Sequence, residues 1–201
     1  MHHTLLKNIQ ILGFLFIGAI IYGQEYQFDI QNTSLDAYIQ MEEQLGSVQM
    51  PNTTKYISLS GNAQPITFKR KGNILPGLVT YLHFKEKDSL MSKVLYEWDP
   101  KNSKELEEGE KQSEEFQKAL IQKYKDLEKE LTTLYGTPKS RGNLSDTTLA
   151  DQPGGLRKNN KWYPNEHTEI ELYIVVSNMY KKSGIVTITP TYRIRLYIKN
   201  R

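Results

Sequence analysis

Apolar residues recur at intervals of three or four between residues 113 and 135, and this spacing predicts one long amphipathic helix. Lysines and acids fill the positions between them, as expected on a face that contacts solvent. Gly136 and Pro138 mark the end of the helix. The apolar stripe consists of Phe116, Leu120, Tyr124, Leu127, Leu131 and Leu134.

Short segments rich in apolar residues flank this helix and predict β-strands, separated by turn-forming Gly, Pro, Asn, Asp and Ser. The predicted strands are residues 55–60, 65–70, 77–84, 89–98, 167–176 and 185–199. A shorter helix is indicated at residues 34–45, where Ser34 can cap the first turn and Gly46 can end the last. We therefore expect an α+β fold: an antiparallel sheet of about six strands with one long amphipathic helix packed on one face. A mostly-β sandwich with an appended helix is the alternative.

The phase of the strands predicts which side chains face the core. In the two central strands the matching set is Leu78, Leu82, Phe84, Leu90, Val94, Tyr96 and Trp98. In the last two strands it is the even-numbered set Ile170, Leu172, Ile174, Val176, Val186, Ile188, Ile194, Leu196 and Ile198.

If the last two strands pair as an antiparallel hairpin, their odd-numbered residues share the other face. Glu169 and Glu171 would then lie opposite or diagonal to Arg193 and Arg195 and would neutralise them. Pro190 has no N–H, so the last strand is expected to be an edge or to bulge there.

The first residues have the pattern of a secretory signal peptide, because Lys7 precedes an uncharged run whose centre is apolar. The mainly apolar stretch at residues 9–22 is 14 residues long. A membrane-spanning helix needs roughly 20 apolar residues. We expect a signal peptide at residues 1–23, followed by a single α+β domain at residues 24–201. An uncleaved N-terminal anchor is the alternative. The remainder is expected to be exported to the periplasm or the extracellular space, with no transmembrane segment after cleavage.

Composition restricts the partners that such a domain could have. The chain has no cysteine, so neither disulfides nor a lipid anchor on an N-terminal cysteine is expected. Removing Lys7 with the signal peptide leaves 25 basic residues against 23 acidic ones, a net charge of +2. This near balance argues against nucleic acid as the partner.

Residues 137–165 show no sustained periodicity and many turn formers, which indicates a long loop of the kind that often carries function. Basic groups next to exposed aromatic rings can hold acidic or sugar-bearing ligands. We therefore predict a binding site for an unknown protein, glycan or small ligand at Arg157, Lys158, Lys161, Trp162 and Tyr163. In the alternative interpretation, Trp162 and Tyr163 start a strand and cover the end of the helix.

Motifs of catalysis are missing from the sequence: GxSxG, HExxH, the P-loop, GxGxxG and the EF-hand loop do not occur. Only His83 and His167 remain after signal cleavage, and His83 is interpreted as a half-buried structural histidine. Glu97 and Asp99 could act on sugars, but strand alternation points both away from Trp98.

His167, Glu169 and Glu171 alternate along one strand face and could offer a divalent metal three ligands. Opposing arginines would repel a cation there, so neither a metal nor another cofactor is predicted. The most consistent interpretation is an exported non-enzymatic binding or interaction module. One alternative is a periplasmic or secreted hydrolase that uses His83 or His167. The other is a structural envelope protein that pairs through its C-terminal edge strand.

Overall fold

The computed structural model describes residues 25–51, 61–71, 75, 77–103, 106 and 109–201. The predicted signal peptide at residues 1–23 and the predicted strand at residues 55–60 lie outside these ranges. Within them, no helix has the length and apolar character needed to cross a membrane.

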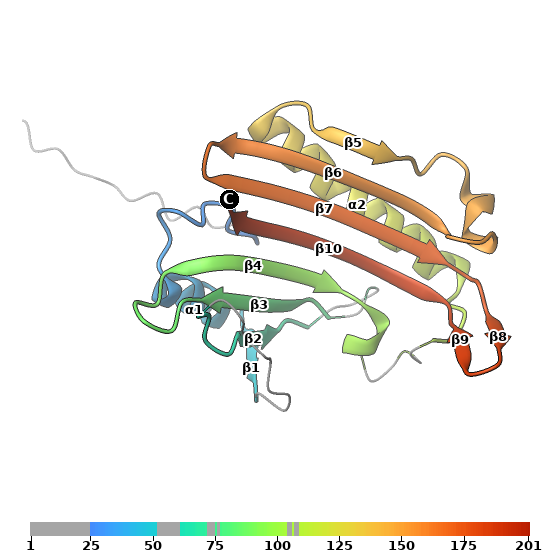
Figure 1. Ribbon diagram of the computed structural model, residues 1–201, viewed down its shortest axis with the longest axis horizontal. Coiled ribbons are helices and arrows are strands. Elements are labelled where there is room, and N and C mark those ends of the chain that lie inside the picture. Colours follow the sequence, from blue (N-terminus) through green and yellow to red (C-terminus); the bar gives the residue numbers. More distant parts are fainter. Residues whose placement is uncertain (1–24, 52–60, 72–74, 76, 104–105, 107–108) are drawn as a thin grey trace, which may run out of the picture.

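An eight-stranded antiparallel sheet dominates the fold, with the strand order β1-β2-β3-β4-β10-β7-β6-β5 (Figure 1). Two short strands, β8 and β9, form a separate hairpin beside it. The expected antiparallel sheet with helices is confirmed, but about six strands was too few. The strands are Val48–Met50 (β1), Ile66–Lys69 (β2), Val79–Phe84 (β3), Met91–Trp98 (β4), Lys139–Gly142 (β5), Leu156–Asn165 (β6), Thr168–Ser177 (β7), Lys181–Ser183 (β8), Val186–Ile188 (β9) and Thr191–Asn200 (β10).

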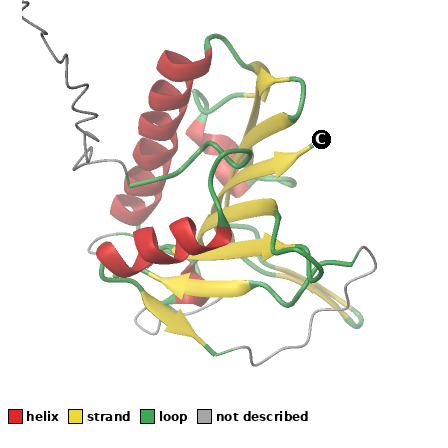
Figure 2. Ribbon diagram, turned by 90° about the vertical axis from the view of Figure 1, so that its left-hand side faces the viewer, coloured by secondary structure: helices red, strands yellow, loops and turns green. Residues whose placement is uncertain are grey.

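In the described residues, two α-helices lie on the same side of this sheet, the long one expected there and the short one predicted at residues 34–45 (Figure 2). The long helix α2 spans Glu114–Tyr135, where Ser113 accepts a hydrogen bond from the Phe116 N–H (3.2 Å) and Gly136 ends the helix at φ +77°. The short helix α1 spans Leu35–Gln44 and is capped by Ser34. The predicted cap at Ser34 and the predicted end at Gly136 are both confirmed. Two short 3-10 helices, Pro100–Asn102 and Thr147–Asp151, lie in connections between these elements.

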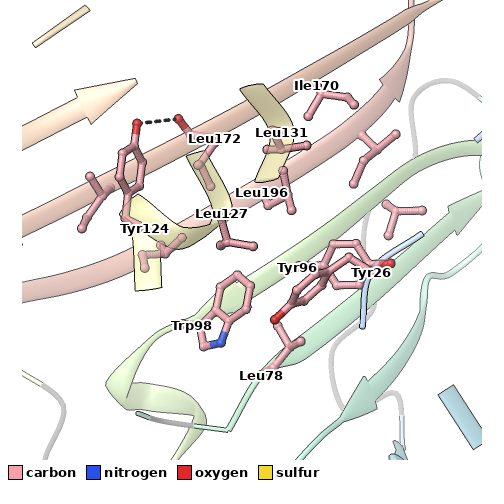
Figure 3. Close-up of a cluster of buried hydrophobic side chains, with 14 of the residues drawn as sticks. Tyr26, Leu78, Tyr96, Trp98, Tyr124, Leu127, Leu131, Ile170, Leu172 and Leu196 are labelled. Carbon is pink, nitrogen blue, oxygen red and sulfur yellow. Dashed lines mark hydrogen bonds between the residues drawn. The ribbon is translucent and has the colours of Figure 1, made fainter. Parts of the chain in front are cut away.

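The core lies between α2 and the even-numbered side chains of the sheet (Figure 3). Five of the six predicted helix positions are buried, and only Leu134, in the last turn, is exposed. Tyr124 donates a hydrogen bond to the carbonyl of Leu172 in β7 (3.5 Å), which ties the helix to the sheet. Tyr26 packs edge-on against Tyr96, with ring centroids 5.4 Å apart.

Three predicted core positions are instead exposed. Val186 and Ile188 belong to the β8–β9 hairpin, because the chain leaves the main sheet before Pro190. Leu90 is 65% exposed, while its neighbour Met91 is buried. A register shift after His83 pairs Phe84 with Met91, and this irregularity changes which residue faces the core.

The last strand is not an edge, so the first of the two expectations drawn from Pro190 was wrong. Strand β10 lies between β4 and β7 in the middle of the sheet. Pro190 precedes the strand at the end of the hairpin, where it takes no place in the ladder. Because both sides of β10 are paired, the proposed pairing of this strand with another protein is contradicted.

A buried ion pair joins α1 to the strand end after β2. Glu42 is fully buried, and its carboxylate accepts two hydrogen bonds from Arg70, one from Nε (2.9 Å) and one from Nη2 (2.7 Å). The guanidinium carbon also lies over the rings of Tyr26 (5.7 Å) and Tyr96 (5.8 Å). This cluster links the N-terminal segment, α1 and the central sheet.

Candidate functional site

Odd-numbered side chains of β6, β7 and β10 project to the face of the sheet opposite the helices, which we call the open face. Figure 1 looks onto this face, with α2 behind β6 and β7. Most of its side chains are half-buried and polar, whereas the even-numbered neighbours in β10 are buried and apolar. Ligand-binding groups on these strands must therefore be sought on the open face.

The arginines of β10 are neutralised, but not by the predicted partners. Arg195 donates to Glu97 of β4 (2.6 Å), and Arg193 forms an ion pair with Asp99. Glu169 and Glu171 instead bind Lys199, each at 3.0 Å. The predicted partners were wrong because β4, which is distant in sequence, pairs with the other side of β10 and places Glu97 directly opposite Arg195.

Glu97 is almost completely buried on the open face. Burial opposes ionisation of its carboxyl group, but the hydrogen bond from Arg195 and the charges of Lys101, Arg195 and Arg193 outweigh this effect. The net result is a pKa held below its ordinary value of 4.5. Interactions of Glu97 thus stabilise the folded state only while its carboxylate is charged.

We predict that acid destabilises the protein through this carboxylate. Because its folded-state pKa is lowered, its contribution to stability is present above the unfolded-state pKa and is lost as the pH falls through the folded-state value. Urea unfolding followed by tryptophan fluorescence from about pH 7 to about pH 3 should show a steeper loss of stability for the wild type than for Glu97→Gln. The exposed Glu166→Gln variant should keep the wild-type profile; parallel profiles for Glu97→Gln and the wild type would contradict this assignment.

A pocket of about 400 Å³ opens between the open face and the β8–β9 hairpin. Tyr173 and Val175 of β7 supply an apolar part of its lining. Met179, which precedes β8, and Ile188 of β9 also line it. The basic side chains in the lining are Arg157, Lys181 and Arg193.

The charges of this pocket are not balanced. Arg193 is paired with Asp99, but Arg157 and Lys181 form no ion pair with any acid that the structure describes. Both side chains belong to exposed residues, and the pocket lining contains neither Asp nor Glu. An anionic group would therefore find two cations whose charge is uncompensated.

Strand alternation divides the five predicted binding residues between the two faces of β6. Arg157, Lys161 and Tyr163 lie on the open face, but only Arg157 lines the pocket. Lys161 is paired with Glu169 (3.0 Å) and Glu171 (3.6 Å). The ring of Tyr163 lies 5.1 Å from the Lys139 ammonium nitrogen.

The other two residues point toward α2. Lys158 forms an ion pair with Glu128 (2.7 Å), and Trp162 is only 2% exposed. The indole N–H of Trp162 donates to the carbonyl of Gly136 (3.0 Å), at the end of α2. The alternative interpretation of Trp162 is therefore confirmed in part: the residue covers the helix end, but it lies inside β6, which begins at Leu156, and does not start a strand.

The predicted loop at residues 137–165 contains β5, a 3-10 helix and β6 instead. Strand β6 escaped detection because two of its inward positions, Lys158 and Asn160, are polar and break the apolar alternation. Both donate hydrogen bonds to Glu128 of α2, at 2.7 Å and 2.8 Å. A partner on a distant helix thus permits polar residues where the strand pattern expects apolar ones.

Neither histidine is paired for catalysis in the described part of the chain. His83 is half-buried on β3 next to Lys93, and burial together with the charge of Lys93 lowers its pKa to about 4. His167 lies in the β6–β7 turn, where its backbone, not its imidazole, makes the hydrogen bonds. The described residues also contain no cluster of His, Asp and Glu that could hold a metal ion.

No protein-family model, curated protein or solved structure matches this chain. The function must therefore be inferred from the geometry of its own side chains.

Sequence reasoning missed most of the pocket lining, including Tyr173, Met179 and Ile188. A usable signal was present at Ser183 and Gly184, since this dipeptide is typical of a tight turn. Together with Pro190 it delimits a short hairpin, whereas the apolar alternation alone suggested one continuous strand.

Proposed function

We propose that the protein is an exported, non-enzymatic binding module that takes a small ligand with an acidic group on an apolar body. The observation that carries this proposal is the pair of uncompensated cations, Arg157 and Lys181, in a pocket with an apolar lining. Export is supported by the signal pattern of residues 1–23.

The shape and chemistry of the pocket agree with this ligand class. Its volume of about 400 Å³ is within the range of pockets that hold small organic ligands, roughly 300–1,000 Å³. A guanidinium group can bind a carboxylate, phosphate or sulfate with two parallel hydrogen bonds. Tyr173, Val175, Met179 and Ile188 would contact the apolar body.

Octanoate and octanol provide a direct test, because they share an apolar chain and differ in charge. We expect octanoate to shift the backbone amide resonances of Arg157, Tyr173 and Val175 in a ¹⁵N-labelled sample. The substitution Arg157→Gln should weaken octanoate binding by about tenfold to a hundredfold, since a hydrogen bond to a charged group is lost. Octanol should bind more weakly and should be insensitive to this substitution.

Arg141→Gln is the matched control, because Arg141 is an exposed arginine on the neighbouring strand β5 and does not line the pocket. Its affinity for octanoate should equal that of the wild type. Equal losses in the two variants would indicate a non-specific effect of charge. Absence of octanoate-induced shifts at the pocket would reject this ligand class.

The hydrolase alternative has no comparable support. It needs an imidazole beside a hydroxyl or a carboxylate, and neither His83 nor His167 makes such a hydrogen bond with a residue that the structure describes. The binding module is therefore the function that the described geometry favours.

A further inference from the structure

The β8–β9 hairpin stands apart from the main sheet at one end of the molecule (Figure 1). Each of its strands has three residues, and Gly184 and Ile185 form the connecting turn, with Gly184 at φ +59°. All residues from Tyr180 to Thr189 are exposed. A hairpin this short contributes little stability by itself, so its exposed side chains need another explanation.

Large apolar side chains are concentrated on this hairpin. Ile185, at the tip, is fully exposed, whereas turn positions are usually polar or glycine. Tyr180, Val186 and Ile188 are 65%, 58% and 50% exposed. Single exposed apolar residues are common on soluble proteins, but several on one projecting element indicate a contact surface.

Positive charge accompanies these apolar groups. Lys181 and Lys182 are exposed on β8, and neither forms an ion pair with an acid in the described ranges. The sequence has no Asp or Glu from residue 172 to residue 201. The hairpin therefore combines apolar side chains with a positive charge that no local acid opposes.

We propose that the tip of the β8–β9 hairpin docks onto an anionic lipid surface. Ile185 would enter the boundary between headgroups and acyl chains, while the ammonium groups of Lys181 and Lys182 would remain among the acidic headgroups. A protein partner fits less well, because a stable interface buries about 800 Å² on each side and the hairpin arms have only three residues each. Shallow insertion into a bilayer requires only a few apolar side chains.

The docking surface shares Lys181 and Ile188 with the pocket, but its two central residues are distinct from the ligand site. Ile185 and Lys182 do not line the pocket, so their substitution separates membrane docking from ligand binding. Octanoate binding, measured without vesicles, should be unchanged in the Ile185→Ser/Lys182→Gln variant. Failure of one proposal would therefore leave the other open to its own test.

Co-sedimentation with vesicles tests the proposal. The wild type should bind vesicles of phosphatidylglycerol and phosphatidylethanolamine and should bind pure phosphatidylcholine much more weakly. Ile185→Ser/Lys182→Gln should weaken binding to the anionic vesicles by at least about tenfold, because both apolar transfer and headgroup attraction are reduced. Added salt should weaken the binding of the wild type.

The β3–β4 turn offers a matched control. Leu90 is 65% exposed there, and Lys87 is exposed three residues before it, the same spacing as Lys182 and Ile185. This turn also contains Glu86 and Asp88, which oppose its positive charge. The control variant Leu90→Ser/Lys87→Gln should bind anionic vesicles like the wild type.

Three outcomes would overturn the proposal. The first is equal binding of the hairpin variant and the wild type to anionic vesicles, and the second is no binding of the wild type to any vesicle. The third is self-association that depends on protein concentration and is abolished by Ile185→Ser/Lys182→Gln, while vesicle binding is unaffected. This result would mean that the hairpin contacts a second copy of the chain. All substituted side chains are exposed, and the thermal unfolding of each variant should confirm that its fold is intact.

Discussion

Substitution of Glu42 by leucine is expected to lower the free energy of unfolding by about 3–5 kcal/mol, because it leaves the buried charge of Arg70 without its partner. Arg70 has only 11% of its side chain exposed, and both of its hydrogen bonds to Glu42 would be lost. Urea unfolding followed by tryptophan fluorescence measures the change. This is the largest effect that we expect from the loss of a single charge.

The double variant Glu42→Leu/Arg70→Met shows whether the cost comes from losing the attraction within the ion pair or from leaving the Arg70 charge buried without a partner. With both charges removed, the desolvation cost of the isolated cation disappears, and most of the stability should return. Glu114→Gln is the surface control. The side chains of Lys118 and Glu114 are 76% and 82% exposed, so loss of their ion pair should leave the free energy of unfolding unchanged. A Glu42→Leu variant as stable as Glu114→Gln would contradict the prediction.

Trp162→Ala is expected to destabilise the protein by about 3–5 kcal/mol, the usual cost of removing a large aromatic side chain from a core. The indole is 2% exposed and donates its N–H to Gly136, so the substitution opens a cavity and leaves the carbonyl at the end of α2 without this donor. Tyr163→Ala, one residue further along, should cost less than about 1 kcal/mol because the ring of Tyr163 is more exposed.

The comparison of Trp162 with Tyr163 decides between a structural role and a binding role for this part of β6. Trp162→Phe keeps most of the volume but removes the N–H donor, so it should be milder than Trp162→Ala and still destabilising. A Trp162→Ala variant with wild-type stability that had lost octanoate binding would support the binding interpretation. Urea unfolding and octanoate titration of the same samples provide both readings.

Several elements could be predicted because their determinants are local. Helix α2 has its cap at Ser113, its apolar stripe and its end at Gly136 all within one continuous segment. The even-numbered apolar residues of β7 and β10 are buried as predicted, since alternation along a strand requires no knowledge of its neighbours. Short-range periodicity was sufficient in both cases.

Other features could not be predicted because they depend on pairs that are far apart in the sequence. Nothing near Arg195 indicates Glu97 as its partner, since the two residues are 98 positions apart. The inward placement of Lys158 and Asn160 depends on Glu128 of α2. The alternation of residues along β6 contains no information about this distant partner. The pocket combines β6, β7, β10 and the β8–β9 hairpin, so no continuous segment contains its signature.

The sequence by itself determined the long helix, the short helix, the buried faces of the last two strands of the main sheet and the freedom from disulfides, because periodicity, capping residues and composition are properties of neighbouring positions. The tertiary structure alone decided which strands became neighbours, and therefore which acid neutralises each arginine and which face Trp162 occupies. It also decided where Arg157 and Lys181 lie without an ion pair to any acid of the described ranges. The physical reason is that ion pairing and pocket formation depend on distances in space, and folding brings together residues whose separation along the chain carries no information about that proximity.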